Sequence, residues 1–323
     1  MASLLHLLGC GLDTAMDRTV VPGFTKIGPA VRKRLPGWPA DPEPDALAGH
    51  TVAVTGATSG LGLATAEGLA RLGARVLLVV RDVPKGERVL VDLRRDVPGA
   101  DARVVRCDIG DLDDVRRFVD ELGEDRVDVL VHNAGALPAK RQESPQGHEL
   151  TMALHVLGPV LMSELLRDRM AGSDARVVFV TSGGMYGQKL RPDDPEYHRG
   201  DYSGTTAYAR SKRAQVELLP LLAARWSPQA IGVHATHPGW ADTPGVTESL
   251  PGFNKVMGPL LRDAESGADT TVWVAGARPQ PPSGQLWHDR RARSTHLLPS
   301  TRTGEAERTA MWSWVSETIG LDS

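Results

Sequence analysis

The feature that most constrains the fold of this chain is a glycine-rich turn, which lies between a short β-branched run and a helical pattern. Residues 51–55 read Thr-Val-Ala-Val-Thr, which is typical of a buried strand, and residues 56–62 read Gly-Ala-Thr-Ser-Gly-Leu-Gly. Apolar residues then recur at helical spacing, as at Leu63, Ala66 and Leu69. A strand, a glycine turn and a helix in this order predict the phosphate-binding unit of a dinucleotide fold.

The individual residues of this turn suggest separate tasks. Gly56 would allow the tight turn after the strand, and Gly60 and Gly62 would let a pyrophosphate approach the backbone while the helix packs close to the sheet. Free N–H groups and a partial positive charge at the helix N-terminus would then bind the phosphates. We therefore expect cofactor contacts at Gly56, Ser59, Gly60, Leu61 and Gly62.

A second motif places a phenol and an ammonium on one helix face. Tyr208 and Lys212 are four residues apart in a segment predicted to be helical from Thr206 to Trp226. A phenol ionises near pH 10, but a lysine charge about 4 Å away would stabilise the phenolate by roughly 4 kcal/mol at intermediate dielectric. The pair is therefore a candidate general acid/base. The alternative is a chance pairing on a solvated helix.

The rest of the chain predicts a doubly wound, Rossmann-type α/β fold with a seven-stranded parallel sheet flanked by helices. Strands are expected near residues 51–55, 75–80, 103–107, 127–132, 176–181, 231–236 and 284–288. Helices are expected to begin near Leu61, Lys85, Leu112, His148, Thr206 and Ser266, with a closing packing helix near 304–319. A ligand would bind beyond the carboxyl ends of the strands, where the motifs lie.

Three regions divide the chain. Residues 1–48 are predicted to be an N-terminal extension and linker, 49–300 the catalytic domain, and 301–323 a C-terminal helix or tail. The extension, called the N-terminal arm below, has an apolar run at residues 4–8 and a basic cluster at 26–34. The apolar run is too short to span a bilayer, so no transmembrane segment is predicted. The arm is either a peripheral membrane tether or, as we favour, a structural arm packed on the domain or on a second subunit.

Composition excludes several classes of function. A formal net charge of −3 gives no electrostatic reason to expect a nucleic-acid partner. Cys10 and Cys107 are the only cysteines and form no metal-binding or redox spacing. Two separate thiols in a chain of this length fit a reducing compartment, so we expect a cytoplasmic protein with no metal site.

These motifs together resemble the short-chain dehydrogenase/reductase (SDR) superfamily. The glycine turn preceded by Thr55 and the later Tyr208/Lys212 pair match it, and the resemblance extends over about residues 49–296. Further motifs follow in the family's order, namely Asn133-Ala134-Gly135, Ser182, Pro238-Gly239 and Thr243. One branch of the superfamily is resembled more closely in the C-terminal half, at residues 182–185, 237–245, 267–269, 283–284, 289–290 and 295–296.

The resemblance implies a role for each matching residue. Tyr208 would exchange the proton with the substrate, Lys212 would lower its pKa and hold the nicotinamide ribose, and Ser182 would hydrogen-bond the carbonyl oxygen. The segment from Gln188 to Thr205 reads as a loop inserted beside the substrate. The implied cofactor contacts are Asp108, Ile109, Asn133, Ala134, Gly135, Tyr208, Lys212, Pro238, Gly239 and Thr243. For Asp108 the alternative is an ordinary role in capping the helix that follows Asp111.

One catalytic position departs from the family pattern. The family's tetrad usually includes an asparagine that holds a water linking the lysine to solvent, and His155 stands at that position. Histidine is larger and titrates near neutrality. The proton relay is therefore either altered, slower or pH-sensitive, or His155 fills the site without consequence. The sequence leaves both alternatives open.

Cofactor choice follows from charge at the end of the second predicted strand. An acidic residue there usually binds the ribose of NAD, whereas an arginine pairs with the 2′-phosphate of NADP. This sequence has Val80 followed by Arg81, so NADP(H) is preferred and NAD(H) is the alternative. Asp82 could instead bind a ribose hydroxyl or pair with Arg81.

The expected function is an NADP(H)-dependent oxidoreductase that interconverts a carbonyl and an alcohol on a lipophilic small molecule. Homo-oligomerisation is left open. The alternatives are a catalytically weak dinucleotide-binding regulator or scaffold, and, less well matched by the glycine spacing, a sugar-nucleotide epimerase or dehydratase. The lipophilic substrate is suggested by apolar residues near the site, which could instead close the core: Met185, Tyr186, Leu190, Trp240, Phe253 and Met257.

Overall fold

An eight-stranded sheet in the order β3-β2-β1-β4-β5-β6-β7-β8 forms the centre of the computed structural model, which describes residues 2–172, 174–242, 252, 255 and 257–321. The first seven strands are parallel, as predicted, and an eighth pairs antiparallel with β7. The strands are β1 (Thr51–Thr55), β2 (Arg75–Val80), β3 (Ala102–Arg106), β4 (Val129–His132), β5 (Arg176–Val180), β6 (Gly232–Thr236), β7 (Gln285–His288) and β8 (Arg291–Arg293).

The additional strand β8 depends on a tight reversal that the sequence pattern did not predict. Asp289 and Arg290, between β7 and β8, both adopt positive φ angles, at 48° and 55°. Non-glycine residues rarely adopt this conformation unless the surroundings hold them there. Buried contacts of both side chains, described below, supply that restraint.

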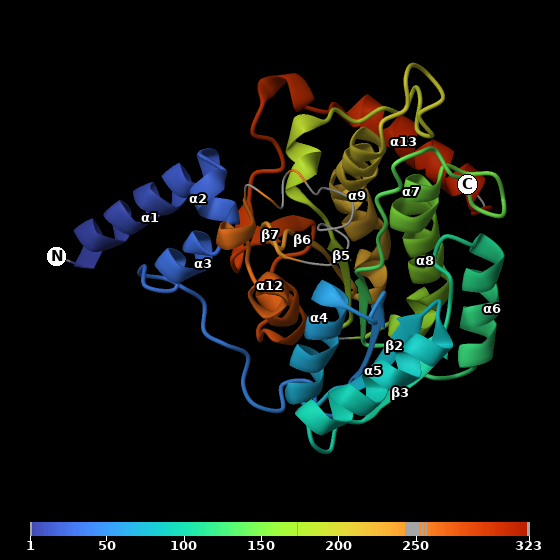
Figure 1. Cartoon of the computed structure of the whole chain (residues 1–323), viewed down its shortest axis with the longest axis horizontal. Helices are drawn as coiled ribbons and strands as arrows, with labels where there is room; N and C mark the ends of the chain where they lie inside the picture. The colour runs from blue at the N-terminus through green and yellow to red at the C-terminus, as the bar shows by residue number, and fades with distance from the viewer. Residues whose placement is uncertain (1, 173, 243–251, 253–254, 256, 322–323) are drawn as a thin grey trace.

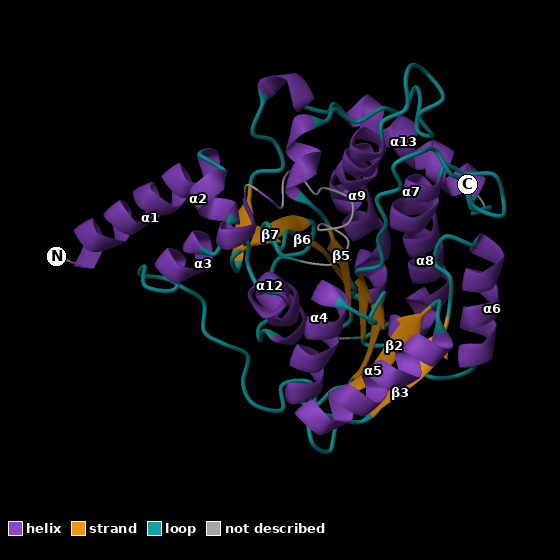
Figure 2. Cartoon of the chain, viewed as in Figure 1, coloured by secondary structure: helices purple, strands orange, loops and turns teal. Residues whose placement is uncertain are grey.

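Helices cover both faces of the sheet (Figure 2). One face carries α4 (Gly60–Arg71), α5 (Val83–Asp96) and α12 (Ala264–Gly276), and the other carries α6 (Leu112–Leu122), α8 (Gly158–Met170) and α9 (Gly204–Trp226). The short helix α7 (Leu150–Met152) and a π-helical turn, η1 (Ala153–Leu157), lead directly into α8. The closing helix α13 (Glu305–Thr318) packs on α9, and it corresponds to the packing helix predicted near residues 304–319.

Alternation along the central strands creates two separate cores. In β1, Val52 and Val54 face the core beneath α4 and α12, whereas Ala53 faces the core beneath α8 and α9. In β2, Val76 and Leu78 likewise point to one side and Leu77 to the other. Both faces of a doubly wound sheet are buried, so its strands read as continuous apolar runs. This explains why the strands were predictable within about two residues.

Polar caps explain why several helices begin earlier than their apolar pattern indicated. Asp82, Ser203 and Asp263 each accept a hydrogen bond from a backbone N–H three residues later, at the starts of α5, α9 and α12. These helices therefore begin two residues before the expected positions. Asp111 caps α6 in the same way and begins it at the predicted Leu112.

The N-terminal arm forms three helices that the sequence analysis did not resolve: α1 (Ala2–Arg18), α2 (Val21–Phe24) and α3 (Ile27–Arg32). They lie at one end of the molecule, beside α12 and β7 (Figure 1). Phe24 and Arg32 of the arm are only 2% and 1% exposed. The arm is therefore packed on the domain through these residues, in line with the interpretation that we favoured.

One stretch of helix, Leu150–Met170, meets the length and hydropathy expected of a membrane span. In its most apolar 18-residue window, 78% is buried inside the protein, where these residues fill the core under α6 and α9. The core of a protein that does not span a membrane contains helices of the same kind, so this stretch is weak evidence for a span.

Candidate active site

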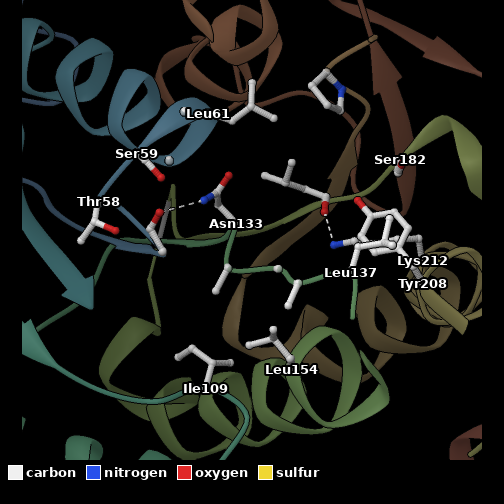
Figure 3. A pocket seen from close by; sticks show the side chains of 18 of the residues that line it. Thr58, Ser59, Leu61, Ile109, Asn133, Leu137, Leu154, Ser182, Tyr208 and Lys212 are labelled. Atoms are coloured by element: carbon white, nitrogen blue, oxygen red, sulfur yellow. Dashed lines mark hydrogen bonds between the residues drawn. The ribbon is translucent and has the colours of Figure 1, made fainter. Parts of the chain in front are cut away.

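A cavity of about 670 Å³ opens at the carboxyl ends of the parallel strands (Figure 3). It lies where the strand order reverses between β1 and β4, the position at which doubly wound sheets bind their ligands. The segments that follow β1, β2, β3, β4, β5 and β6 all contribute to its walls. Motifs separated by more than 180 residues in the sequence are thereby brought to one site.

The glycine turn is held in place by the strand beside it. Gly56 has a φ angle of 66°, and a Cβ there would lie 2.8 Å from the Cα of Ala134, so only glycine fits. The hydroxyl of Thr55 accepts hydrogen bonds from the backbone N–H groups of Asn133 and Ala134, at 3.0 and 2.9 Å. The Asn133 amide donates back to the carbonyl oxygen of Thr55 at 3.0 Å. The turn is therefore rigid before any ligand binds.

Gly62 allows the close packing of the helix that was expected of it. A Cβ there would lie 2.3 Å from the carbonyl oxygen of Gly56 and 2.4 Å from the Asn133 amide nitrogen, so this glycine lets the first turn of α4 pack on the preceding turn. Ser59 is the N-cap residue of α4, and its side chain makes no capping hydrogen bond. The first N–H groups of α4 can therefore bind an anion in the cavity.

Ser182, Tyr208 and Lys212 lie together in the cavity wall, across the cavity from Thr58 and Ser59 of the glycine turn (Figure 3). Ser182 is the second residue after β5, and Tyr208 and Lys212 lie one turn apart in α9. The Ser182 side chain lies beside the Tyr208 hydroxyl and acts to lower its pKa. The Lys212 ammonium donates to the carbonyl oxygen of Val180 at 2.8 Å and lies 5.6 Å from the centre of the Tyr208 ring.

The electrostatics of this pair differ from the simple expectation. Burial raises the pKa of Tyr208 above its ordinary value, and the neighbouring Ser182 side chain only partly opposes that rise. Burial also lowers the pKa of the Lys212 ammonium to about 7. The expected lowering of the phenol pKa by Lys212 is therefore not found, because the ammonium is itself desolvated and its hydrogen bond goes to Val180.

His155 lies behind the cavity wall in the π-helical turn η1 and is fully buried. Its Nε2 accepts a hydrogen bond from the backbone N–H of Ala136 at 3.2 Å, so the ring proton is on Nδ1, which lies 2.8 Å from the Ser211 hydroxyl. That hydroxyl in turn donates to the carbonyl oxygen of Tyr208 at 2.8 Å. Both ring nitrogens are thus occupied in supporting the backbone around the cavity, which favours the second alternative for this residue.

His155→Asn is expected to leave the shape of the pH–activity profile between about pH 6 and 9 unchanged. Burial, and then the charge of Lys212, hold the pKa of His155 well below 6.5, so the ring is already neutral in this range. Steady-state rates across this range test it, with His155→Leu, which cannot bond Ala136, as the comparison. A new or lost ionisation near pH 6.5 in the asparagine variant would restore the proton-relay hypothesis.

Arg81 follows β2 at the adenosine end of the predicted site. Its side chain is 78% exposed and lies 3.8 Å from the Asp108 carboxylate. Asp82 caps α5 by accepting from the Lys85 N–H at 2.9 Å and so does not pair with Arg81. Asp108 accepts from the Gly110 N–H at 3.0 Å, and the helix cap itself is Asp111. Because the Arg81 side chain is mostly exposed and its ion pair with Asp108 is long, its guanidinium can turn toward a ligand.

Lys85 is a second cation in the same wall, and it was not among the residues predicted from the sequence. It lies four residues after Arg81 in the first turn of α5, and that spacing was the available signal. Other wall residues that were also missed are Thr58, Leu137, Leu154 and Thr205. Backbone turns and helix ends place these side chains at the cavity, and their sequence spacing carries no motif.

Most of the predicted site residues line the cavity, and the exceptions have physical reasons. Gly239 faces away, because a Cβ there would lie 2.6 Å from the carbonyl oxygen of Phe24 in the arm. His155 supports the wall from behind, and Thr243 lies outside the described residues. The lining residues among the predicted set are Gly56, Ser59, Gly60, Leu61, Gly62, Arg81, Asp108, Ile109, Asn133, Ala134, Gly135, Ser182, Tyr208, Lys212 and Pro238.

The apolar residues expected near the substrate mostly fill the core. Met185, Tyr186 and Leu190 are 0%, 7% and 2% exposed and belong to the hydrophobic core beneath α9. Trp240 does line the cavity. Phe253 lies outside the described residues, and Met257 is half-buried. For the first three residues, the alternative that they close the core is correct.

The fold and the site together define an α/β enzyme that uses a nicotinamide dinucleotide to act on an alcohol or carbonyl group. A model of the short chain dehydrogenase family matches residues 50–252. Dehydrogenase/reductase SDR family member 12 of Bos taurus is 38% identical over 264 residues, covering 80% of this chain and 82% of its own. Retinol dehydrogenase 12 of Bos taurus is 32% identical, covering 91% and 94%.

A solved structure gives the same result for the fold. The NADP active-site complex of RhlG from Pseudomonas aeruginosa superimposes with a TM-score of 0.62 at 25% identity, covering 76% of this chain and 97% of that one. The chain belongs to the short-chain dehydrogenase/reductase family. SDR family member 12 represents the branch of the superfamily that the C-terminal half was found to resemble more closely, and the similarity to this protein confirms that resemblance.

Proposed function

We propose that this protein is an NADP(H)-dependent oxidoreductase that interconverts a lipophilic ketone or aldehyde and the corresponding alcohol, with Tyr208 as general acid/base. The observation that carries this proposal is the meeting of Ser182, Tyr208 and Lys212 in one cavity with the glycine turn of α4. A nicotinamide dinucleotide supplies or accepts the hydride when bound. The protein must then orient the carbonyl and manage one proton.

Each polar side chain has a task that fits its environment. The phenol of Tyr208, whose pKa is raised by burial, stays protonated near neutrality and can donate its proton to a carbonyl oxygen during reduction. The Ser182 hydroxyl, which lies beside that of Tyr208, would bind the same oxygen as negative charge develops. Lys212 would bind ribose hydroxyls and favour the phenolate in the reverse reaction once its ammonium leaves Val180.

The cavity favours an apolar substrate. Leu137, Leu154 and Trp240 line it, and these are large apolar side chains; Leu137 and Leu154 lie on the same side of the cavity as Tyr208 (Figure 3). A pocket of this kind binds by burying apolar surface, while a few polar groups fix the orientation. A relative named as a retinol dehydrogenase acts on a lipophilic alcohol, which supports the same substrate class for this chain.

Arg81→Ala is expected to raise the Kd for NADPH by about tenfold or more and that for NADH by less than about twofold, because only NADPH carries a 2′-phosphate for the guanidinium to bind. Lys85 in the same wall keeps some affinity in this variant. Fluorescence titration of both nucleotides measures the effect, with Arg88→Ala on the exposed face of α5 as the matched control. Equal losses for the two nucleotides would contradict the NADP(H) preference.

The proposed function is tested by NADPH consumption with purified protein across a panel of lipophilic ketones and aldehydes. Turnover that depends on Tyr208 would support the reductase. A regulator or scaffold makes the opposite prediction, since it would bind NADPH tightly and turn over no member of the panel at a rate above the Tyr208→Phe background. Retention of Ser182, Tyr208 and Lys212 in one cavity is the reason that we favour the enzyme.

A further inference from the structure

Phe24 of the N-terminal arm is buried against the segment that follows β6. Its ring lies edge-on to His237, with ring centres 4.4 Å apart, and edge-on to Trp240, with centres 5.8 Å apart. On its other sides it meets Tyr186 and His288 at 6.0 and 5.2 Å. One side chain of the arm thus contacts rings from three separate parts of the domain.

Backbone hydrogen bonds join the arm to the same segment. The Trp240 N–H donates to the carbonyl oxygen of Phe24 at 2.7 Å, and the Lys26 N–H donates to that of Leu260 at 3.0 Å. The Arg262 N–H donates to the carbonyl oxygen of Trp240 at 2.8 Å. The arm and residues 240 and 260–262 therefore form one hydrogen-bonded unit, of which Trp240 faces the cavity.

The Arg262 side chain strengthens this unit. It is 1% exposed and donates to the carbonyl oxygens of Phe24 at 3.1 Å and Gly23 at 2.7 Å. It also donates to the carbonyl oxygen of Thr25 at 3.2 Å and to the Asp289 carboxylate at 2.6 Å, and it lies 3.4 Å from the Nε2 atom of His288. Asp289 in turn accepts from Arg32 of the arm at 2.6 Å. Buried, fully bonded guanidinium groups hold neighbouring backbone rigidly.

The same ring limits the turn that follows Ser182. A Cβ on Gly183 would lie 2.9 Å from the Phe24 ring, so the backbone of this turn packs directly against that ring. Ser182 precedes this glycine and lines the cavity. Phe24 thus lies behind two walls of the cavity, one carrying Ser182 and the other carrying Pro238 and Trp240.

We propose that Phe24 is a positioning residue for the reaction centre, and that the N-terminal arm fixes the relative placement of Ser182 and the Pro238–Trp240 wall. This inference rests on the proposed function, because it assigns those two walls to the substrate and the reacting end of the cofactor. The glycine turn and Arg81, which would bind the phosphates and adenosine, are not among the Phe24 partners described above. Removing Phe24 should therefore impair turnover much more than nucleotide affinity.

The test compares Phe24→Ala and Phe24→Leu with Leu47→Ala in the full-length protein. Leu47 is also completely buried at the junction of the arm and the domain, but it packs in the other core, beneath α4 and α12. Three quantities are measured for each variant: the thermal midpoint, the steady-state kcat and KM with the Kd for NADPH, and amide hydrogen exchange of Trp240 without nucleotide.

Phe24→Ala is expected to lower kcat by at least about tenfold with the Kd for NADPH within about threefold, since small displacements of aligned groups cost rate steeply. The Trp240 amide should exchange faster, because its acceptor is the Phe24 carbonyl. Phe24→Leu should recover part of both effects. Leu47→Ala should leave kcat and the Trp240 exchange unchanged, although its thermal midpoint falls.

Two results would overturn the proposal. The first is a folded Phe24→Ala protein with kcat and Trp240 exchange near wild type. The second is an equal loss of kcat in Leu47→Ala at a similar thermal midpoint, which would make the effect one of stability alone. If the wild type shows no turnover with any carbonyl, the proposed function fails. The exchange of Trp240 in Phe24→Ala then still decides whether the arm holds this wall.

Discussion

Tyr208→Phe is expected to lower carbonyl reduction by about 10³-fold while NADPH still binds with nearly unchanged affinity. The substitution removes only the hydroxyl that would donate the proton and that lies beside Ser182. The ring remains against His155, whose centre lies 5.3 Å away, so the local packing is retained. Single-turnover rates and an NADPH titration on the same preparation separate the chemical step from binding.

Tyr202→Phe provides a matched control for the loss of one phenol hydroxyl. Tyr202 lies in the loop before α9 and donates its hydroxyl proton to the Glu149 carboxylate at 2.8 Å. It is not part of the cavity wall among the residues described, so this variant should turn over substrate within about threefold of wild type. Retained turnover in Tyr208→Phe would remove Tyr208 from the mechanism.

Asp289→Asn is expected to lower the free energy of unfolding by about 3–5 kcal/mol. Asp289 is 2% exposed, and its two carboxylate oxygens accept from Arg262 and Arg32, each at 2.6 Å. An asparagine keeps one acceptor but turns an N–H₂ group toward a guanidinium, which leaves buried positive charge uncompensated. Chemical denaturation measures the loss, with Asp92→Asn in an exposed ion pair on α5 as the control.

The pH dependence of this effect has a definite sign. Burial alone would raise the pKa of Asp289, but the charges of His288, Arg262 and Arg32 hold it far below the ordinary 3.8. The unfolded chain therefore binds a proton at a pH where the folded protein does not. The stabilisation is fully present above the unfolded pKa of about 4 and is lost as the pH falls toward the folded pKa.

The difference in unfolding free energy between wild type and Asp289→Asn should accordingly be constant from about pH 6 to 8 and shrink below about pH 4. Denaturation curves collected at these pH values, with Asp92→Asn alongside, check this. A difference that stays constant down to about pH 3 would show that the carboxylate is not held in its charged form by the two arginines.

The β-branched strands and the glycine turn could be predicted because their signals are local. Residues 51–55 form a continuous run of apolar and β-branched residues, because both faces of the strand are buried. Glycine is required at position 56, because any larger side chain would collide with Ala134. Tyr208 and Lys212 share a helix face by their spacing alone. The cavity that joins these motifs then followed from the topology of a doubly wound sheet.

The state of the site residues was not predictable in the same way. Spacing put Lys212 beside Tyr208, but the hydrogen bond to Val180 and the burial of both groups set their pKa values. From the sequence alone, His155 could titrate in the place of the usual asparagine. Its two hydrogen-bond partners, Ala136 and Ser211, lie in other segments of the chain, and the residues around His155 give no sign of them. Desolvation and hydrogen bonding depend on the packed surroundings.

The sequence by itself determined the fold class, the order of the motifs and the edge of the sheet at which they meet, because strand burial, helix periodicity and turn chemistry act over a few residues. Only the tertiary structure decided where the N-terminal arm goes. The arm is joined to the domain through Arg32 and Asp289, which are 257 residues apart in sequence. A basic residue in a basic cluster carries no local sign that it will be buried, because burial of a charge depends on a partner supplied by distant chain.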